Sequence, residues 1–221
     1  MSVILPAPVH DYVSSFARLP HAELAVIHDE GVRQGIPVVD PQSGALLHAL
    51  VRAARAHRVL EIGTAVGYSG LWMATALPPD GMLITLERDR ARAEIARGHF
   101  TAAGVADRVT VMVGDALQYL HKVAGPFDVI FQDGDKMSYT PLLDRLVTLL
   151  RPGGVLVTDN VLWSGEVIPG YVNPPQRSAA DTAAIAAYNQ TLASDTRLFT
   201  TFLPIGDGVA VSIKLQDTTH S

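Results

Sequence analysis

The stretch that decides the fold is residues 59–70, VLEIGTAVGYSG. It begins with the apolar run Val59–Ile62, interrupted only by Glu61, which is typical of a short buried strand. Three glycines follow, and glycine permits both a tight turn and a close approach of a ligand to the backbone. The combination indicates a strand that ends in a ligand-binding loop.

Short apolar runs of the same kind recur along the chain, separated by segments long enough for a helix that crosses the sheet. The runs are Met82–Leu86, Val109–Val113, Phe127–Phe131 and Val155–Thr158. Such an alternation predicts a parallel sheet with helices on both faces.

The C-terminal part breaks this alternation. The runs Leu198–Leu203 and Val209–Leu215 are separated by PIGDG, whose proline and glycines indicate a turn. Two strands separated by so short a turn favour an antiparallel hairpin at one edge of the sheet. The expected fold class is therefore α/β: a Rossmann-like, doubly wound, mostly parallel sheet with a C-terminal antiparallel hairpin.

The N-terminal part is predicted to be helical from residue 10 to residue 56, because apolar residues recur there at helical intervals. Within it, Asp40-Pro41 predicts an N-cap followed by proline at the first helical position. We expect a single domain over residues 1–221, with a helical cover at 1–56 and a Rossmann-like core at 57–215.

Composition excludes several classes of function. The net charge is −5 and no basic block occurs, so a broad nucleic-acid interface is disfavoured. The absence of cysteine excludes disulfides, thiolate metal sites and a cysteine nucleophile. No apolar segment is long enough to span a membrane, and the N-terminus lacks the basic start of a signal peptide. We therefore expect a cytoplasmic protein without membrane contact.

Side chains at the carboxyl ends of the predicted strands suit a nucleoside. Glu87 ends the second run, where a carboxylate can accept hydrogen bonds from ribose hydroxyls. Asp115 follows the third run and can accept one from an adenine amino group. Together with the loop at Gly63, these residues lie where open α/β sheets bind their ligands.

The glycine spacing distinguishes between two kinds of nucleoside ligand. NAD sites use G-x-G-x-x-G, because a pyrophosphate rests on the helix N-terminus. Here Ala65 stands in place of the second glycine, and the loop reads E-x-G-x-x-x-G. This pattern suits a nucleoside without phosphates and disfavours an NAD-dependent dehydrogenase.

A second group of polar residues follows the fourth and fifth runs, which are expected to be neighbouring strands. Asp133, Asp159 and Asn160 supply two carboxylates and an amide oxygen, hard donors that suit Mg²⁺, Mn²⁺ or Ca²⁺ and leave about three octahedral positions open. The alternative is that these acids cap loops or helices. The presence of Lys136, three residues after Asp133, disfavours this alternative. Asp135 either orients Lys136 or faces solvent.

Four segments resemble the cation-dependent O-methyltransferases of the caffeoyl-CoA and catechol type: VLEIGTAVGYSG, FQDGDKMSY, LLRPGGVLVTDNVLWSGEV and LPIGDGVAV. They occur in order within residues 36–215. A Rossmann-like sheet ending in a hairpin is also typical of class I methyltransferases. The chain departs from the family pattern at Gly134, where alanine is commoner, and in the Pro-Gln-Ser-Gly after Asp40, where the family often reads Pro-Gln/Glu-x-Gly-Gln.

The resemblance implies a site with three functions. S-adenosylmethionine (SAM) would be held by Val38, Glu61, Gly63, Ser69, Glu87, Asp115, Ala116 and Asp133. A divalent cation, Mg²⁺ before Mn²⁺ or Ca²⁺, would be bound by Asp133, Asp159 and Asn160. Lys136 would act as the general base. Family members are commonly homodimers, so a homodimer is expected.

These residues permit methylation of a small catechol-like or phenylpropanoid acceptor. A phenol with a pKa near 10 is mostly neutral at pH 7, and a divalent ion lowers the pKa of a bound hydroxyl while Lys136 takes its proton. A dry rim favours the reaction of the resulting anion with a cation. Ile36, Trp163 and Tyr171 are its candidates, although Trp163 equally suits ordinary packing. The loop Glu166–Arg177, with three prolines, does not follow the family and leaves the acceptor open.

Three other functions stay open at this point. A tRNA hydroxyuridine O-methyltransferase is one, since some bacterial relatives act on RNA, but the acidic net charge disfavours it. The others are an NAD-dependent dehydrogenase and a non-catalytic SAM-binding protein.

Overall fold

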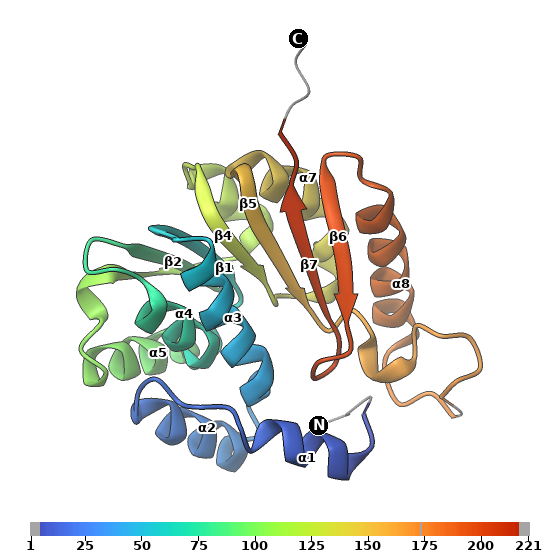
Figure 1. The fold of residues 1–221 in the computed structure, drawn as a ribbon, viewed down its shortest axis with the longest axis horizontal. Helices are drawn as coiled ribbons and strands as arrows, with labels where there is room; N and C mark the ends of the chain where they lie inside the picture. Colours follow the sequence, from blue (N-terminus) through green and yellow to red (C-terminus); the bar gives the residue numbers. More distant parts are fainter. Residues whose placement is uncertain (1–4, 173, 217–221) are drawn as a thin grey trace.

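The computed structural model describes residues 5–172 and 174–216, and within them a seven-stranded sheet runs through the molecule (Figure 1). Its strand order is β3-β2-β1-β4-β5-β7-β6. The strands are β1 (Arg58–Ile62), β2 (Met82–Glu87), β3 (Val109–Val113), β4 (Phe127–Gln132), β5 (Leu150–Asp159), β6 (Leu198–Leu203) and β7 (Val209–Lys214). Strands β1 to β5 pair in parallel, and β7 pairs antiparallel with β5 and β6. The predicted fold class is confirmed.

Helices cover both faces of this sheet (Figure 1). The α-helices are α1 (Ala7–Ser14), α2 (Glu23–Gln34), α3 (Pro41–Ala53), α4 (Tyr68–Ala76), α5 (Arg90–Ala102), α6 (Ala116–Tyr119), α7 (Tyr139–Leu149) and α8 (Ala179–Ser194). Short 3-10 helices are η1 (Ala106–Arg108), η2 (Leu120–Lys122), η3 (Lys136–Ser138) and η4 (Trp163–Gly165). Among the residues described, no helix is both long and apolar enough to cross a membrane.

Each central strand contributes to two separate apolar cores. On β1, Val59 belongs to the core shared with helices α2 to α5, and the next residue, Leu60, to the core shared with α7 and α8. Successive side chains of a strand point to opposite faces, so a strand buried on both faces is apolar at most positions. This is why the predicted strands appear in the sequence as continuous apolar runs.

Helix α3 is part of the body of the molecule. The Asp40 carboxylate caps it by accepting hydrogen bonds from the backbone N–H groups of Gln42 and Ser43, at 2.8 and 3.2 Å, as predicted. Further along the helix, Leu47 and Val51 are buried in the core that α3 shares with the sheet. Helix α2 also contributes buried residues to this core, whereas α1 contributes none. Both helices lie at the end of the molecule toward which β4 and β5 run (Figure 1), and the division into cover and core stays a prediction.

The helical range predicted for residues 10–56 is interrupted. Helix α2 ends at Gln34, because Gly35 adopts a left-handed conformation with a φ of +63°. The following segment, residues 36–40, is not helical and lines the cavity described below. Strand β5 also differs from its prediction, since it begins at Leu150. Pro152-Gly153-Gly154 suggests a turn in the sequence, but in the structure it lies within the strand.

The packing of α3 against α4 predicts that replacing one glycine lowers the stability of the protein. A Cβ atom on Gly44 would overlap the indole of Trp72, which is buried. Gly44→Ala should therefore lower the free energy of unfolding by about 1–3 kcal/mol, the usual cost of overpacking, as measured by urea denaturation.

Gly98 on α5 is the matched control, because a Cβ there meets no atom within 4 Å. Gly98→Ala should be neutral or raise the stability by up to about 1 kcal/mol. Equal effects of the two substitutions would contradict the packing described for α3 and α4.

Candidate active site

A cavity of about 740 Å³ opens at the carboxyl ends of the parallel strands. Its wall is completed by the segment after α2, by the loop before α8 and by the turn of the C-terminal hairpin. Twelve of the residues singled out in the sequence line it: Ile36, Val38, Gly63, Ser69, Glu87, Asp115, Ala116, Asp133, Lys136, Asp159, Asn160 and Trp163. Residues that lie far apart in the chain therefore meet in one space, as expected for an open α/β sheet.

Glu87 holds the glycine loop at one end of this cavity. Its Oε2 accepts a hydrogen bond from the backbone N–H of Ala65 at 2.8 Å, and its Oε1 accepts one from the backbone N–H of Asp89 at 2.9 Å. Each carboxylate oxygen can accept more than one bond, so both stay able to accept from ligand hydroxyls. The loop also comes close to β4: a Cβ on Gly63, whose φ is +96°, would overlap the backbone carbonyl of Asp133.

Asp115 lies beside this loop, at the start of α6. Its Oδ1 accepts a hydrogen bond from the backbone N–H of Leu117 at 2.8 Å, so this carboxylate is an N-cap as well as part of the cavity wall. Its other oxygen makes no hydrogen bond to a described residue. The position fits the predicted contact with a base amino group, which stays a prediction.

Glu61 lies behind the cavity wall. It is 0% exposed and does not line the cavity, and its two oxygens accept hydrogen bonds from the hydroxyls of Ser69 and Thr85, both at 2.6 Å. Burial raises the pKa of this carboxyl from 4.5 to about 7, although the two hydroxyl groups lower it. Glu61 therefore reaches the cavity through Ser69, and its expected role as a direct ligand of SAM stays a prediction.

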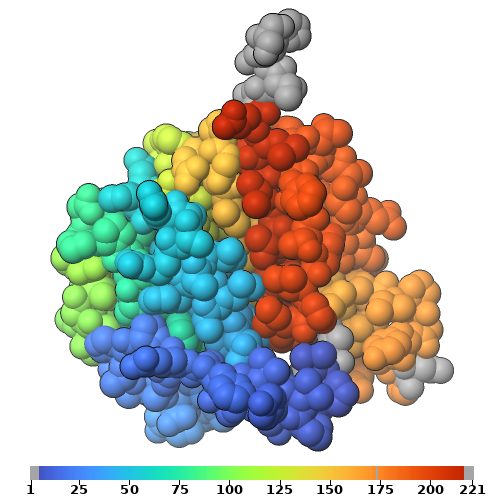
Figure 2. All heavy atoms as spheres, viewed as in Figure 1, coloured from blue at the N-terminus to red at the C-terminus, as the bar shows by residue number. Residues whose placement is uncertain are grey.

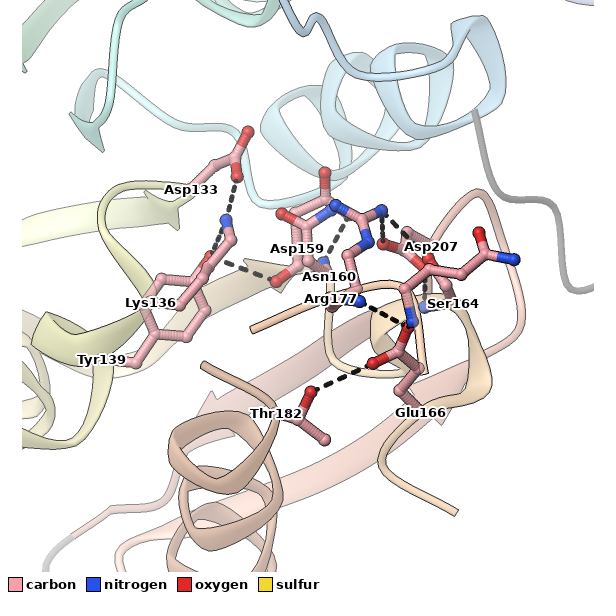
Figure 3. A network of polar contacts seen from close by, with 11 residues as sticks. Asp133, Lys136, Tyr139, Asp159, Asn160, Ser164, Glu166, Arg177, Thr182 and Asp207 are labelled. Carbon is pink, nitrogen blue, oxygen red and sulfur yellow. Dashed lines mark hydrogen bonds and ion pairs between the residues drawn. The ribbon is translucent and has the colours of Figure 1, made fainter. Parts of the chain in front are cut away.

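The second end of the cavity lies where β4 and β5 run side by side and end in acids (Figure 3). Asp159 is buried, and its pKa is raised well above the ordinary value, first by burial and then by the negative charge of Asp133. The Asp159 Oδ1 accepts a hydrogen bond from the backbone N–H of Asn160 at 2.8 Å. Asn160 itself has a φ of +61°, a conformation that asparagine tolerates better than most residues.

Lys136 stands next to these acids. Its Nζ donates hydrogen bonds to Asp133 Oδ1 and to the phenol oxygen of Tyr139, both at 2.9 Å (Figure 3). The Tyr139 hydroxyl in turn donates to the backbone carbonyl of Asp159 at 3.2 Å. Burial raises the pKa of Tyr139 well above 10, so the tyrosine stays neutral and acts as a hydrogen-bonding link. The interpretation of the sequence missed Tyr139. Its position, three residues after Lys136 at the start of a helix, could have indicated a contact between the two side chains.

The donor set fits a hard divalent cation. Two carboxylates close enough to disfavour each other's charge, with one amide beside them, are stabilised by a positive ion.

The rim differs from its prediction in one residue. Ile36 and Trp163 line the cavity, and the Trp163 ring centroid lies 5.8 Å from Lys136 Nζ. Tyr171 does not line it: the side chain is 64% exposed, and its ring packs over Gly165, where a Cβ would lie 2.6 Å away. The assignment of Tyr171 to the rim is wrong because the loop turns its ring outward. Arg177, from the same loop, lies over the Trp163 ring at 4.5 Å.

Comparison with known proteins agrees with this architecture. The chain matches the family model described as O-methyltransferase over residues 23–215. It is 34% identical to the catechol O-methyltransferase of Niastella koreensis over 216 residues, which cover 93% of this chain and 96% of that protein. It is 32% identical to the caffeoyl-CoA O-methyltransferase of Eucalyptus gunnii over 191 residues, which cover 82% and 75% of the two chains.

A solved structure of an O-methyltransferase is also similar to this chain. The O-methyltransferase TomG from Streptomyces achromogenes, in complex with SAM, is similar with a TM-score of 0.82 and 33% identity over 95% of this chain and 96% of that one. This chain belongs to the O-methyltransferase family whose model it matches. Membership sets aside the dehydrogenase alternative.

The buried carboxyl of Glu61 predicts a dependence of stability on pH. Because its folded-state pKa of about 7 is above the unfolded value of 4.5, folding favours the protonated form. Its stabilising contribution is fully present below pH 4.5 and is lost as pH rises to about 7. Relative to Glu61→Gln, the unfolding free energy of the protein should fall by about 3 kcal/mol over this window.

Urea denaturation at several pH values between 4.5 and 8 measures this difference. Gln keeps the shape of the side chain and does not ionise, so it isolates the titration of one group. A difference that is constant with pH would mean that Glu61 titrates normally in the folded protein.

Proposed function

We propose that this protein transfers the methyl group of SAM to one hydroxyl of a catechol-like aromatic diol, with a divalent cation held by Asp133, Asp159 and Asn160. One observation carries the proposal: the acids that end β4 and β5 share a cavity with Glu87 and the glycine loop. A site for a methyl donor and a site for a chelating acceptor are thereby joined. The relatives named for catechol and caffeoyl-CoA support this acceptor class.

SAM would occupy the end of the cavity formed by β1 to β3. The carboxylates of Glu87 and Asp115 are suited to the ribose hydroxyls and the adenine amino group, and Gly63 leaves room for the ligand beside the backbone. Val38, on the segment after α2, lines the same cavity and would lie beside the methionine part. The SAM-bound structure of the similar protein TomG supports this cofactor.

The acceptor would lie between this end and the acids of β4 and β5. When bound there, a divalent cation lowers the pKa of a hydroxyl that coordinates it. Asp133, Asp159 and Asn160 would hold it, and Trp163 and Ile36 would keep water from the reacting atoms. The wall of the cavity would hold the acceptor beside SAM, and alignment of two reactants can contribute several kcal/mol to catalysis.

Lys136 would receive the acceptor proton. Its Nζ is held by Asp133 and Tyr139 at the edge of the cavity. With Nζ in its neutral amine form, the acceptor hydroxyl would give its proton to this nitrogen, which becomes an ammonium beside Asp133. The acceptor oxygen would form a bond to the methyl carbon as the bond from that carbon to sulfur breaks. The products are the methyl ether and S-adenosylhomocysteine.

Removal of the proposed base should therefore be costly. Lys136→Ala should lower kcat at pH 7 by roughly 10²–10⁴-fold, the usual range of general acid–base catalysis, with SAM affinity retained. Tyr139→Phe is the matched variant: it removes a partner of Nζ and leaves the amine, so it should cost less. A Lys136→Ala variant within a few-fold of the parent's kcat would exclude the base role.

The acceptor and the cation are tested in one experiment. Transfer of labelled methyl groups from SAM is measured with catechol, phenol and bulk tRNA, each with and without EDTA. We expect transfer to catechol, almost none to phenol because one hydroxyl cannot chelate, loss with EDTA and recovery with Mg²⁺ or Mn²⁺. Equal rates on phenol, or full activity in EDTA, would contradict the proposal, and transfer to tRNA alone would support the RNA alternative.

A homodimer stays a prediction, and one surface supports it. Phe199 and Ile213 pair across β6 and β7, and their side chains are 67% and 42% exposed. In the part of the chain that the structure describes, no helix covers this side of the hairpin, which is open at the surface (Figures 1 and 2). A second copy of the chain would bury this apolar face.

A further inference from the structure

The loop between β5 and α8 brings a cation into the active-site cavity. Arg177, near the end of this loop, lines the cavity, although the loop does not follow the family pattern in sequence. Its backbone is fixed by Glu166, whose Oε1 accepts hydrogen bonds from the N–H groups of Gln176 and Arg177 at 2.7 and 2.9 Å. The other oxygen of Glu166 accepts from the hydroxyl of Thr182, at 3.3 Å, in the first turns of α8.

The guanidinium of Arg177 contacts Ser164 and Asp207, both seen in Figure 3, and also the Trp163 ring. Its Nη2 donates to Ser164 Oγ at 2.9 Å and faces Asp207 Oδ2 at 3.5 Å, and its Cζ lies 4.5 Å from the Trp163 ring centroid. A flexible side chain is thereby given one position before any ligand binds, and a prearranged donor loses less entropy on binding.

Part of this guanidinium is still available to a ligand. Both N–H groups of Nη2 are accounted for by Ser164 and Asp207, but Nε and Nη1 make no hydrogen bond to any residue in the described part of the chain. The side chain is 39% exposed, so these donors can be reached from the cavity. A guanidinium with open N–H donors is suited to a carboxylate.

The position of Arg177 relative to Lys136 defines which part of an acceptor it would meet. The two cations lie 4.5 and 5.8 Å from the same Trp163 ring, which places them within about 10 Å of each other. In Figure 3 they lie on opposite sides of Asp159 and Asn160. An aromatic acceptor with its diol beside Lys136 would therefore extend along Trp163 and present its far substituent to Arg177.

We infer that Arg177 binds a carboxylate on the acceptor, and that the protein selects catechol acids over neutral catechols. The inference rests on the proposed function, because it names a subclass of the same acceptor. The competing interpretation is that Arg177 only ties the loop to the hairpin through Asp207. Asp181 also lines the cavity. If Asp207 neutralised Arg177 completely, the negative charge of Asp181 would repel a carboxylate on the acceptor.

The experiment compares 3,4-dihydroxybenzoate with its methyl ester, two acceptors that share the diol and differ in the charge. The protein should favour the acid in kcat/KM by about 10–100-fold, mainly through KM, as expected for a hydrogen bond to a charged group. Arg177→Gln should reduce this ratio to near one, and Arg177→Lys should restore part of it. Arg90→Gln makes the same change of charge outside the cavity and should leave the ratio as it is.

The outcomes separate the two interpretations. If Arg177 is only a structural tie, Arg177→Gln lowers transfer to both acceptors alike and the ratio is kept, which overturns the inference. A ratio near one in the unmodified protein, with EDTA-sensitive transfer to both acceptors, overturns the inference alone. No transfer to either acceptor overturns the proposed function and the inference with it.

Discussion

Two carboxylates that end neighbouring strands are the constraint on which the rest of the site depends. The parallel pairing of β4 with β5 brings Asp133 and Asp159 to the same end of the sheet, where burial and the negative charge of Asp133 oppose the ionisation of Asp159. Lys136 offsets part of this charge through Asp133, and Tyr139 links the lysine to the backbone of β5. A divalent cation would offset the rest, so the same arrangement that is unfavourable without an ion favours its binding.

The remaining structure joins this pair to the end of the cavity proposed for the methyl donor. Glu87 fixes the glycine loop through Ala65, and the absence of a side chain at Gly63 lets that loop lie against the strand end that carries Asp133. Behind the wall, Glu61 orients Ser69 and Thr85 through a carboxyl that folding prefers to protonate. The two ends of the cavity are thus joined through the pairing of β1 with β4 and the close approach of Gly63 to Asp133.

The sequence predicted the features that depend on local pattern. It did not predict the features that depend on tertiary packing. Strand runs, the hairpin and the Asp40 cap follow from periodicity and turn chemistry, and parallel topology then places the strand-end acids together. Pro152-Gly153-Gly154 hid the start of β5, because proline and glycine are typical of turns. In the structure these residues lie within the strand, where its register with β4 shifts. The outward turn of Tyr171 and the inward position of Arg177 depend on contacts with Gly165 and Asp207, which no local pattern reveals.

Binding of Mn²⁺ to the intact protein, followed by electron paramagnetic resonance, tests the central claim most directly, because it does not require the acceptor to be known. The account predicts one specific site that Asp159→Ala abolishes, with the fold and SAM affinity retained. Asp135→Ala, which removes an exposed acid two residues from Asp133, should leave the site in place. Failure of the protein to bind Mn²⁺, or undiminished binding by Asp159→Ala, would contradict the claim that these strand ends form a cation site.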